Sequence, residues 1–82
     1  MAIKVQALVR LKPGVLDVQG KAVEQGLKNI GREDVHGVRI GRLIELEVDA
    51  KSWSEAEIIA KELCQKVLAN TVIEQFEIRQ VS

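Results

Sequence analysis

The alternating run at the start of the chain limits the fold more than any other feature of the sequence. Every second residue from Ile3 to Leu11 is apolar, and Lys4, Gln6 and Arg10 stand between these positions. A period of two predicts a β-strand with one buried face. Lys12-Pro13-Gly14 ends the strand, because proline cannot donate a ladder hydrogen bond and Pro-Gly favours a turn. Such a strand requires further strands beside it and a layer over its apolar face.

An amphipathic helix is predicted to follow this turn. Asp17 is a favourable N-cap, and Gly31 fits the left-handed position that closes a helix. Gly20 and Gly26 each weaken a helix by up to about 1 kcal/mol relative to alanine, which indicates close packing at both positions. The apolar or small stripe of the helix consists of Val18, Ala22, Val23, Gly26, Leu27 and Ile30.

A second helix is indicated by a capping box. With Ser54 as N-cap, Glu57 occupies the third helical position and Trp53 can pack on Ile58 as a hydrophobic staple. Ser52 with Glu55 is a competing register. Asn70 is expected to end the helix in the left-handed conformation. The buried stripe is predicted to be Ala56, Ile59, Ala60, Leu63 and Val67.

Three further strands are expected, at Val35 to Ile40, Leu43 to Asp49 and Val72 to Val81. Gly41 lies between the first two, where a tight hairpin needs a positive φ. Strands and helices then follow the order βαββαβ. This order predicts a ferredoxin-like α+β sandwich, in which a four-stranded antiparallel sheet carries two helices on one face.

Composition excludes several classes of function. The 82 residues suffice for a single domain, residues 1–82, and 12 basic and 12 acidic side chains cancel. Zero net charge disfavours nucleic acid as the partner, and with two aromatic residues, Trp53 and Phe76, no base-stacking platform is available. No apolar run is long enough to span a membrane, and the N-terminus does not resemble a signal peptide. A single cysteine also agrees with a reducing compartment, so a cytoplasmic location is expected.

The sequence offers no set of catalytic residues. His36 is the single histidine and Cys64 the single cysteine, so one chain cannot assemble an ordinary metal site. Cys64 is expected to be a packed, inert thiol, because a nucleophilic cysteine needs a nearby base or a depressed pKa. Glu45 and Glu47 point to the same face of a strand, where basic side chains of neighbouring strands can pair with them. We therefore predict no catalytic residue, no metal and no cofactor bound by this chain.

The outward register of the sheet carries three apolar residues among charges, namely Leu8, Leu43 and Ile73. Apolar groups gathered on a face that would otherwise be wet indicate a docking surface. These residues are therefore the predicted oligomer face.

Three motifs in order resemble the PurS family, the small subunit of phosphoribosylformylglycinamidine (FGAM) synthase. They are Leu11 to Val23 (LKPGVLDVQGKAV), Val38 to Leu46 (VRIGRLIEL) and Cys64 to Glu74 (CQKVLANTVIE). The family commonly has proline where this chain has Val18. Proline is tolerated at the first helical position, so the helix start is expected to be unaffected.

The resemblance implies a non-catalytic subunit of an ATP- and glutamine-dependent ligase in de novo purine biosynthesis. In the family this subunit bridges the glutaminase subunit and the large synthetase subunit, which uses ATP and Mg, and it supports ammonia transfer between them. It also forms homodimers. The residues of the matched motifs without a clear core role are the candidates for the partner interface: Asp17, Gly20, Lys21, Arg39, Gly41, Arg42, Asn70 and Thr71.

The alternative is a regulatory module of the ACT type, which shares the βαββαβ order. Such a module would bind an amino acid at a dimer interface near the first strand–helix loop, where Pro13-Gly14 could stand in for its glycine-rich turn.

Overall fold

A computed structural model describes residues 1–81 of the chain. The elements follow the order β1 (Ala2–Leu11), α1 (Val18–Asn29), β2 (Gly41–Asp49), α2 (Trp53–Leu63), a short π-helix η1 (Cys64–Leu68) and β3 (Glu74–Gln80). Within these residues the sheet has three antiparallel strands in the order β2-β1-β3. The last strand, β3, is shorter than the strand predicted at Val72 to Val81.

The predicted alternation of β1 is confirmed. Val5, Ala7 and Val9 are fully buried or nearly so, while Lys4 and Arg10 are exposed. The register places apolar partners of β2 and β3 on the same face: Ile3 opposite Val48, Val5 opposite Leu46, Ala7 opposite Ile44 and Ile78, and Val9 opposite Phe76.

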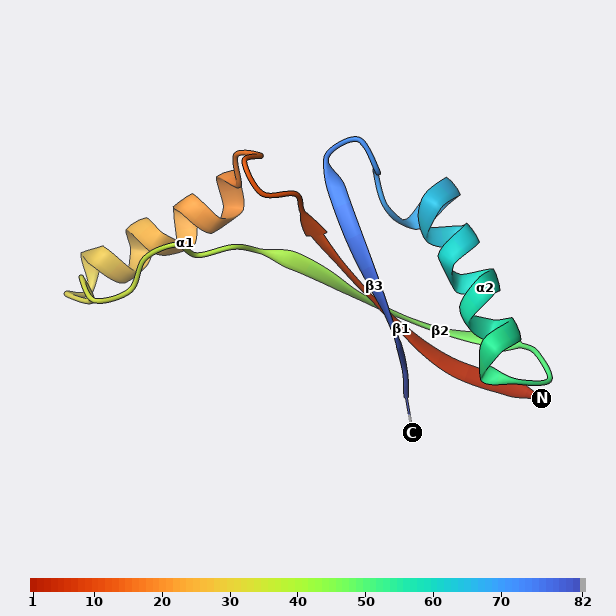
Figure 1. Cartoon of the computed structure of the whole chain (residues 1–82). Helices are drawn as coiled ribbons and strands as arrows, with labels where there is room; N and C mark the ends of the chain where they lie inside the picture. The colour runs from red at the N-terminus through yellow and green to blue at the C-terminus, as the bar shows by residue number, and fades with distance from the viewer. Residues whose placement is uncertain (82) are drawn as a thin grey trace.

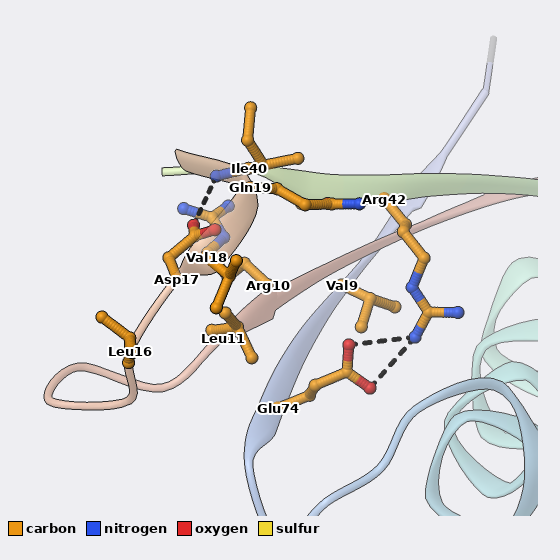
Figure 2. Close-up of a pocket in the computed structure, with 11 residues that line it drawn as sticks. Val9, Arg10, Leu11, Leu16, Asp17, Val18, Gln19, Ile40, Arg42 and Glu74 are labelled. Carbon is orange, nitrogen blue, oxygen red and sulfur yellow. Dashed lines mark hydrogen bonds and ion pairs between the residues drawn. The ribbon is translucent and has the colours of Figure 1, made fainter. Parts of the chain in front are cut away.

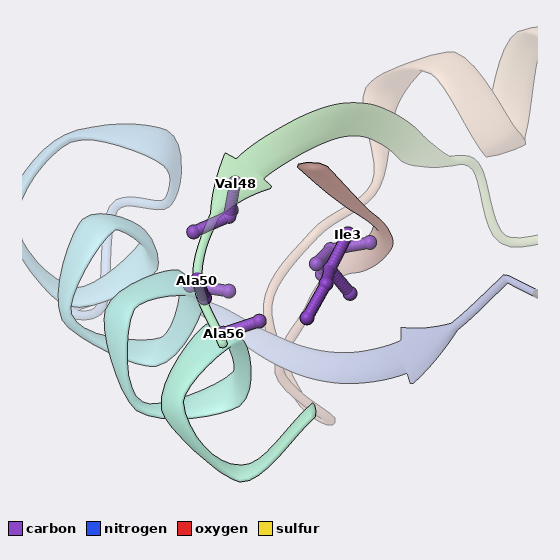
Figure 3. Close-up of a cluster of buried hydrophobic side chains, with 6 residues drawn as sticks. Ile3, Val48, Ala50 and Ala56 are labelled. Carbon is purple, nitrogen blue, oxygen red and sulfur yellow. The ribbon is translucent and has the colours of Figure 1, made fainter. Parts of the chain in front are cut away.

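Helix α2 covers this apolar face and forms the core with it (Figure 3). Ala56 and Ala60 are completely buried, and their small side chains let the helix backbone approach Ile3 and Val48 closely. Trp53 and Ile59 pack on the margin of the cluster. The core is small, as expected for a chain of 82 residues.

The predicted N-cap of α2 is corrected by the structure. The Ser52 side chain, not that of Ser54, accepts a hydrogen bond, from the Glu55 N–H at 3.3 Å. Trp53 becomes the first helical residue and packs on the core, while Ile58 is exposed, so the staple between them does not form. Packing of the partly buried indole against the core outweighs a staple on the surface.

The predicted end of α2 is also corrected. Asn70 does not take a positive φ, because η1 interposes a π-turn and Ala69 already has an extended conformation. Instead, the Asn70 backbone carbonyl accepts hydrogen bonds from the N–H groups of Ile73 and Glu74. Asn70 therefore organises the turn into β3 rather than the end of the helix.

Helix α1 does not lie on the sheet, contrary to the prediction of two helices on one face. Figure 1 shows α1 beyond one end of the strands, whereas α2 lies beside them toward the other end. The molecule is accordingly elongated, with extents of 51 × 28 × 14 Å. The apolar stripe of α1 is left open, and Gly20 is its one buried residue. We call α1 together with residues 35–40 the arm.

The predicted strand Val35 to Ile40 is not a strand in residues 1–81. The ladder between β1 and β2 begins at Gly41, and residues 35–40 continue β2 beyond the sheet to run beside α1 (Figure 1). Gly41 does not form a hairpin and has no positive φ. Its role is close approach, because a Cβ there would lie 2.7 Å from the Val9 carbonyl oxygen.

The predicted start of α1 is confirmed and leads to a test. Asp17 is the N-cap and Val18 the first helical residue. Proline fits this position, and it reduces the freedom of the unfolded chain. We expect Val18→Pro to leave the melting temperature unchanged or to raise it, as measured by thermal denaturation followed by circular dichroism. A large fall would contradict the assigned cap.

Candidate interaction site

The start of α1 is attached to residues 35–40 by the carboxylate of Asp17. Oδ1 accepts from the Gly20 N–H at 2.7 Å, and Oδ2 accepts from the Ile40 N–H at 2.7 Å (Figure 2). The side chain is buried. These two hydrogen bonds, first that of Ile40 and then that of Gly20, hold the pKa of Asp17 below its ordinary value. One carboxylate thus caps the helix and fixes the chain that returns past it.

Glu24 makes a second attachment, which sequence reasoning missed. Its Oε1 accepts from the N–H groups of Gly37 at 2.6 Å and Val38 at 3.3 Å. The hydrogen bonds from Val38 and Gly37 lower the pKa of Glu24. In the sequence Glu24 resembles the other polar residues of the solvent face, and only the return of residues 37–38 along the helix distinguishes it.

Arg39 joins the arm to the turn after β1. Its guanidinium donates to the carbonyl oxygens of Val15 at 3.0 Å and Lys12 at 3.2 Å, and Nε lies 3.9 Å from Asp17 Oδ2. The side chain remains 45 % exposed. Arg39 therefore stabilises the local turn and presents positive charge at the surface.

Arg42 joins β2 to the segment after α2. Its Nη2 lies 3.0 Å from each carboxylate oxygen of Glu74 and donates to the Leu68 carbonyl (Figure 2). Glu74 also accepts from the Asn70 N–H at 2.7 Å. The bond from Asn70, followed by the effect of Arg42, lowers the pKa of Glu74. This network spans the sheet from one edge strand to the other above Val9.

The candidate interface residues fall into two groups. Asp17, Gly20, Lys21 and Arg39 surround the start of α1, and Arg42 and Asn70 belong to the network on Glu74. A shallow hollow of about 270 Å³ lies between the groups, lined by Asp17, Gly41 and Arg42 among others (Figure 2). Lys21 and Thr71 are exposed. The other six candidates make contacts within the chain, either hydrogen bonds or close packing of a glycine.

The predicted oligomer face is only partly assembled. Leu8 and Leu43 are directly opposite each other on the side of the sheet away from α2. Leu43 is 53 % exposed and Leu8 is half-buried. Ile73 precedes β3, where its carbonyl accepts from the Lys12 N–H, and it lies farther along the sheet. A second apolar surface, absent from the prediction, is the open stripe of α1.

The side chains that could bind a metal or act in catalysis do not form a site in the described part of the chain. Within residues 1–81 no three metal-ligating side chains are grouped as a metal site. Cys64 is buried, and burial raises the pKa of its thiol. Glu45 and Glu47 are exposed, and Gln6 donates to Glu45 at 3.3 Å. Over the same residues, no helix has the length and apolar character needed to cross a bilayer.

The fold and these surfaces define a class of protein, namely a small ferredoxin-like α+β protein with exposed apolar faces. Comparison with known proteins identifies the family. Residues 4–82 match the family model PurS, described as phosphoribosylformylglycinamidine (FGAM) synthase. The chain therefore belongs to the PurS family of FGAM synthase, which acts in purine biosynthesis.

Individual relatives agree along nearly the whole length. The PurS subunit of Bacillus subtilis is 44% identical over 80 residues, which are 95% of this chain and 94% of the relative. The crystal structure of Methanocaldococcus jannaschii PurS, 28% identical, aligns with a TM-score of 0.86 over 100% of this chain and 98% of that one. A chain of the PurLQS structure from Thermotoga maritima, 31% identical, gives 0.89 over 99% of both chains.

Proposed function

We propose that this chain is the non-catalytic small subunit that bridges the glutaminase and the ATP-dependent synthetase subunits of FGAM synthase in the cytoplasm. The observation that carries the proposal is the similarity of the whole chain, at a TM-score of 0.89, to a chain of the T. maritima PurLQS structure. We propose further that residues 1–82 act as one PurS-like domain, and that the ATP and Mg of the reaction belong to the synthetase. Family membership favours this function over an ACT-type module.

A physical reason supports a subunit without chemistry of its own. Ammonia released by a glutaminase is diluted and protonated in bulk water. Holding two active sites in one docked assembly restricts its escape and raises its effective concentration at the second site. The hydrogen bonds of Asp17, Arg39 and Arg42 tie distant segments of this chain together, which favours a fixed geometry.

Two surfaces are assigned to partners in this proposal. The groups around α1 and around Glu74, with Asp17, Gly20, Lys21, Arg39, Gly41, Arg42, Asn70 and Thr71, contact the other subunits. The apolar surface around Leu8, Leu43 and Ile73 contributes to a homodimer. Exposed apolar groups of this kind on a small protein favour association.

Omission and add-back test the function. The glutaminase and synthetase subunits of the source organism are assayed for glutamine-dependent synthesis with and without this chain, and ammonia replaces glutamine as a control. We expect the glutamine-dependent rate to require the chain. Equal rates in its absence would contradict the proposal.

Thr71 offers a test of the partner surface, since its exposed side chain lies in the turn between Asn70 and β3. We expect Thr71→Arg to weaken binding to the other subunits by about tenfold, the effect of losing about 1.4 kcal/mol at a contact. Binding is measured by titration of labelled chain, and Ser54→Arg, on exposed α2 surface outside the proposed interface, is the matched control. Unchanged affinity together with an unchanged melting temperature would remove Thr71 from the interface.

A further inference from the structure

Two apolar side chains are strongly exposed in the junction between β1 and α1, which consists of residues 12–21. Leu16 and Val18 are each 70 % exposed, and they flank the buried Asp17 in the chain (Figure 2). Leu16 also lines two shallow hollows, the one of about 270 Å³ described above and a second of about 330 Å³. Exposed apolar groups beside hollows indicate a surface for contact with another molecule.

The backbone of the junction is held in one shape although these side chains are exposed. Arg39 donates to the carbonyl oxygens of Lys12 and Val15, and the Val15 N–H donates to the Lys12 carbonyl at 3.1 Å. The Asp17 carboxylate fixes the residues that follow through two backbone N–H groups. A surface that is already ordered loses little conformational freedom when a partner binds to it.

The exposed charges at the junction are basic. Lys21 and Arg39 line the second hollow, and their side chains are 69 % and 45 % exposed. The two carboxylates of the same hollow, those of Asp17 and Glu24, are largely buried, and each accepts hydrogen bonds from two backbone N–H groups. The groups that remain for a partner are therefore a guanidinium and an ammonium, which bind carboxylates through charge-assisted hydrogen bonds.

We propose that the junction docks onto an acidic surface with an apolar cleft on a partner subunit. Leu16 and Val18 are the anchors that enter the cleft, and Lys21 and Arg39 pair with carboxylates at its rim. The proposal rests on the proposed function and specifies the chemistry of one of its contacts. In protein interfaces buried anchors supply most of the affinity, whereas rim charges mainly speed association and select the partner.

Val18→Glu separates binding from folding. Val18 is the first residue of α1, where an acidic side chain is favourable for the helix. The same change removes an apolar anchor and sets a negative charge against the acidic partner. We expect a melting temperature equal to that of wild type or higher, together with binding weaker by about tenfold or more. Binding is measured by titrating the labelled chain with the glutaminase subunit, the synthetase subunit and both together.

Leu16→Asp and Ile58→Asp form a matched pair for the second anchor. The two original side chains are 70 % and 67 % exposed, and Ile58 lies on α2, outside the proposed surface. We expect Leu16→Asp to weaken binding by about tenfold or more and Ile58→Asp to leave it unchanged. Leu16→Ala removes the anchor without adding a charge, so its effect should be smaller than that of Leu16→Asp.

Lys21→Glu tests the charge of the partner surface, and Lys61→Glu on α2 is its control. Both lysines are exposed helical residues. At low ionic strength we expect Lys21→Glu to slow association by about tenfold and to reduce the salt dependence of binding, because rim charges act on the encounter. Lys61→Glu should change neither. Circular dichroism checks that α1 is intact, since Lys21 lies 3.7 Å from Glu24 in wild type.

Each outcome supports or overturns the proposal. Weaker binding of both anchor variants, together with the salt effect at Lys21, supports it. Unchanged affinity of either anchor variant overturns the junction as the docking surface and leaves the proposed function intact. Loss at the anchors without an effect of Lys21→Glu overturns the acidic partner. If the variants change only the mass of the isolated chain by light scattering, the occupant is a second copy and the proposal is overturned. A wild-type chain that binds neither subunit overturns the proposed function as well.

Discussion

Gly20→Ala is expected to lower the free energy of unfolding by about 2–3 kcal/mol, the scale of a forced overlap in a packed site. A Cβ at Gly20 would overlap the Val38 carbonyl oxygen and lie 2.9 Å from the Asp17 carboxyl carbon. Neither neighbour can move cheaply, because Val38 is backbone and Asp17 is fixed by its two hydrogen bonds. Urea denaturation of wild type and variant, followed by circular dichroism, measures the difference.

Gly26→Ala on the same helix is the matched control. No atom lies within 4 Å of a Cβ at Gly26, so the close packing predicted there from the sequence is absent. Alanine should therefore stabilise α1 by up to about 1 kcal/mol through its helix propensity alone. Equal effects of the two substitutions would contradict the close contact between Gly20 and the Val38 carbonyl group.

The local features of the fold were the predictable ones. Alternation over Ile3 to Leu11 needs only a buried face, and the Asp17 cap needs only the N–H groups that begin the helix, so sequence neighbours determine both. The prediction of a strand at Val35 to Ile40 was wrong for the single chain, and the reason is related. A pattern predicts an extended, two-faced segment, but it does not say whether a neighbour is present to pair with it.

The candidate site was predictable in its residues and not in their contacts. The motifs directed attention to Asp17, Arg39 and Arg42, which the structure places in hydrogen-bonded networks. Apart from the cap on Gly20, their hydrogen-bond partners are backbone groups and Glu74, at separations of more than twenty residues, and no sequence spacing encodes those contacts. The role of Glu24 was missed because its hydrogen-bond donors are the backbone N–H groups of Gly37 and Val38. Backbone groups are present at nearly every residue, so the sequence does not distinguish these two.

The choice between Ser52 and Ser54 shows how packing overrides a local rule. Both serines offer a hydroxyl three residues before a glutamate, so the capping box alone does not decide between them. Starting the helix at Trp53 carries the indole onto the core, and the cap at Ser52 follows from that placement. Tertiary contacts thus selected the register that looked weaker in the sequence.

Asp17→Asn is expected to loosen the arm at neutral pH and to change how stability depends on acid. Asparagine keeps one acceptor oxygen but turns an amide NH₂ toward the second backbone N–H, so either the Gly20 or the Ile40 bond is lost. We expect a melting temperature several degrees below that of wild type at pH 7, and faster amide exchange at Ile40. Glu33→Gln, which changes an exposed carboxylate outside this network, should leave both unchanged.

The acid branch of the same experiment follows from the direction of the pKa shift. Backbone hydrogen bonds hold the pKa of folded Asp17 below the ordinary 3.8, so the folded state favours the ionised form. The stabilisation is complete above the unfolded pKa and disappears as the pH falls through the folded one. Melting temperatures of wild type and Asp17→Asn should therefore begin to converge as the pH falls through about 4, near the unfolded pKa, and should meet below the lower folded pKa. A constant difference from pH 7 to pH 2 would mean that the variant acts through packing and not through the lost carboxylate.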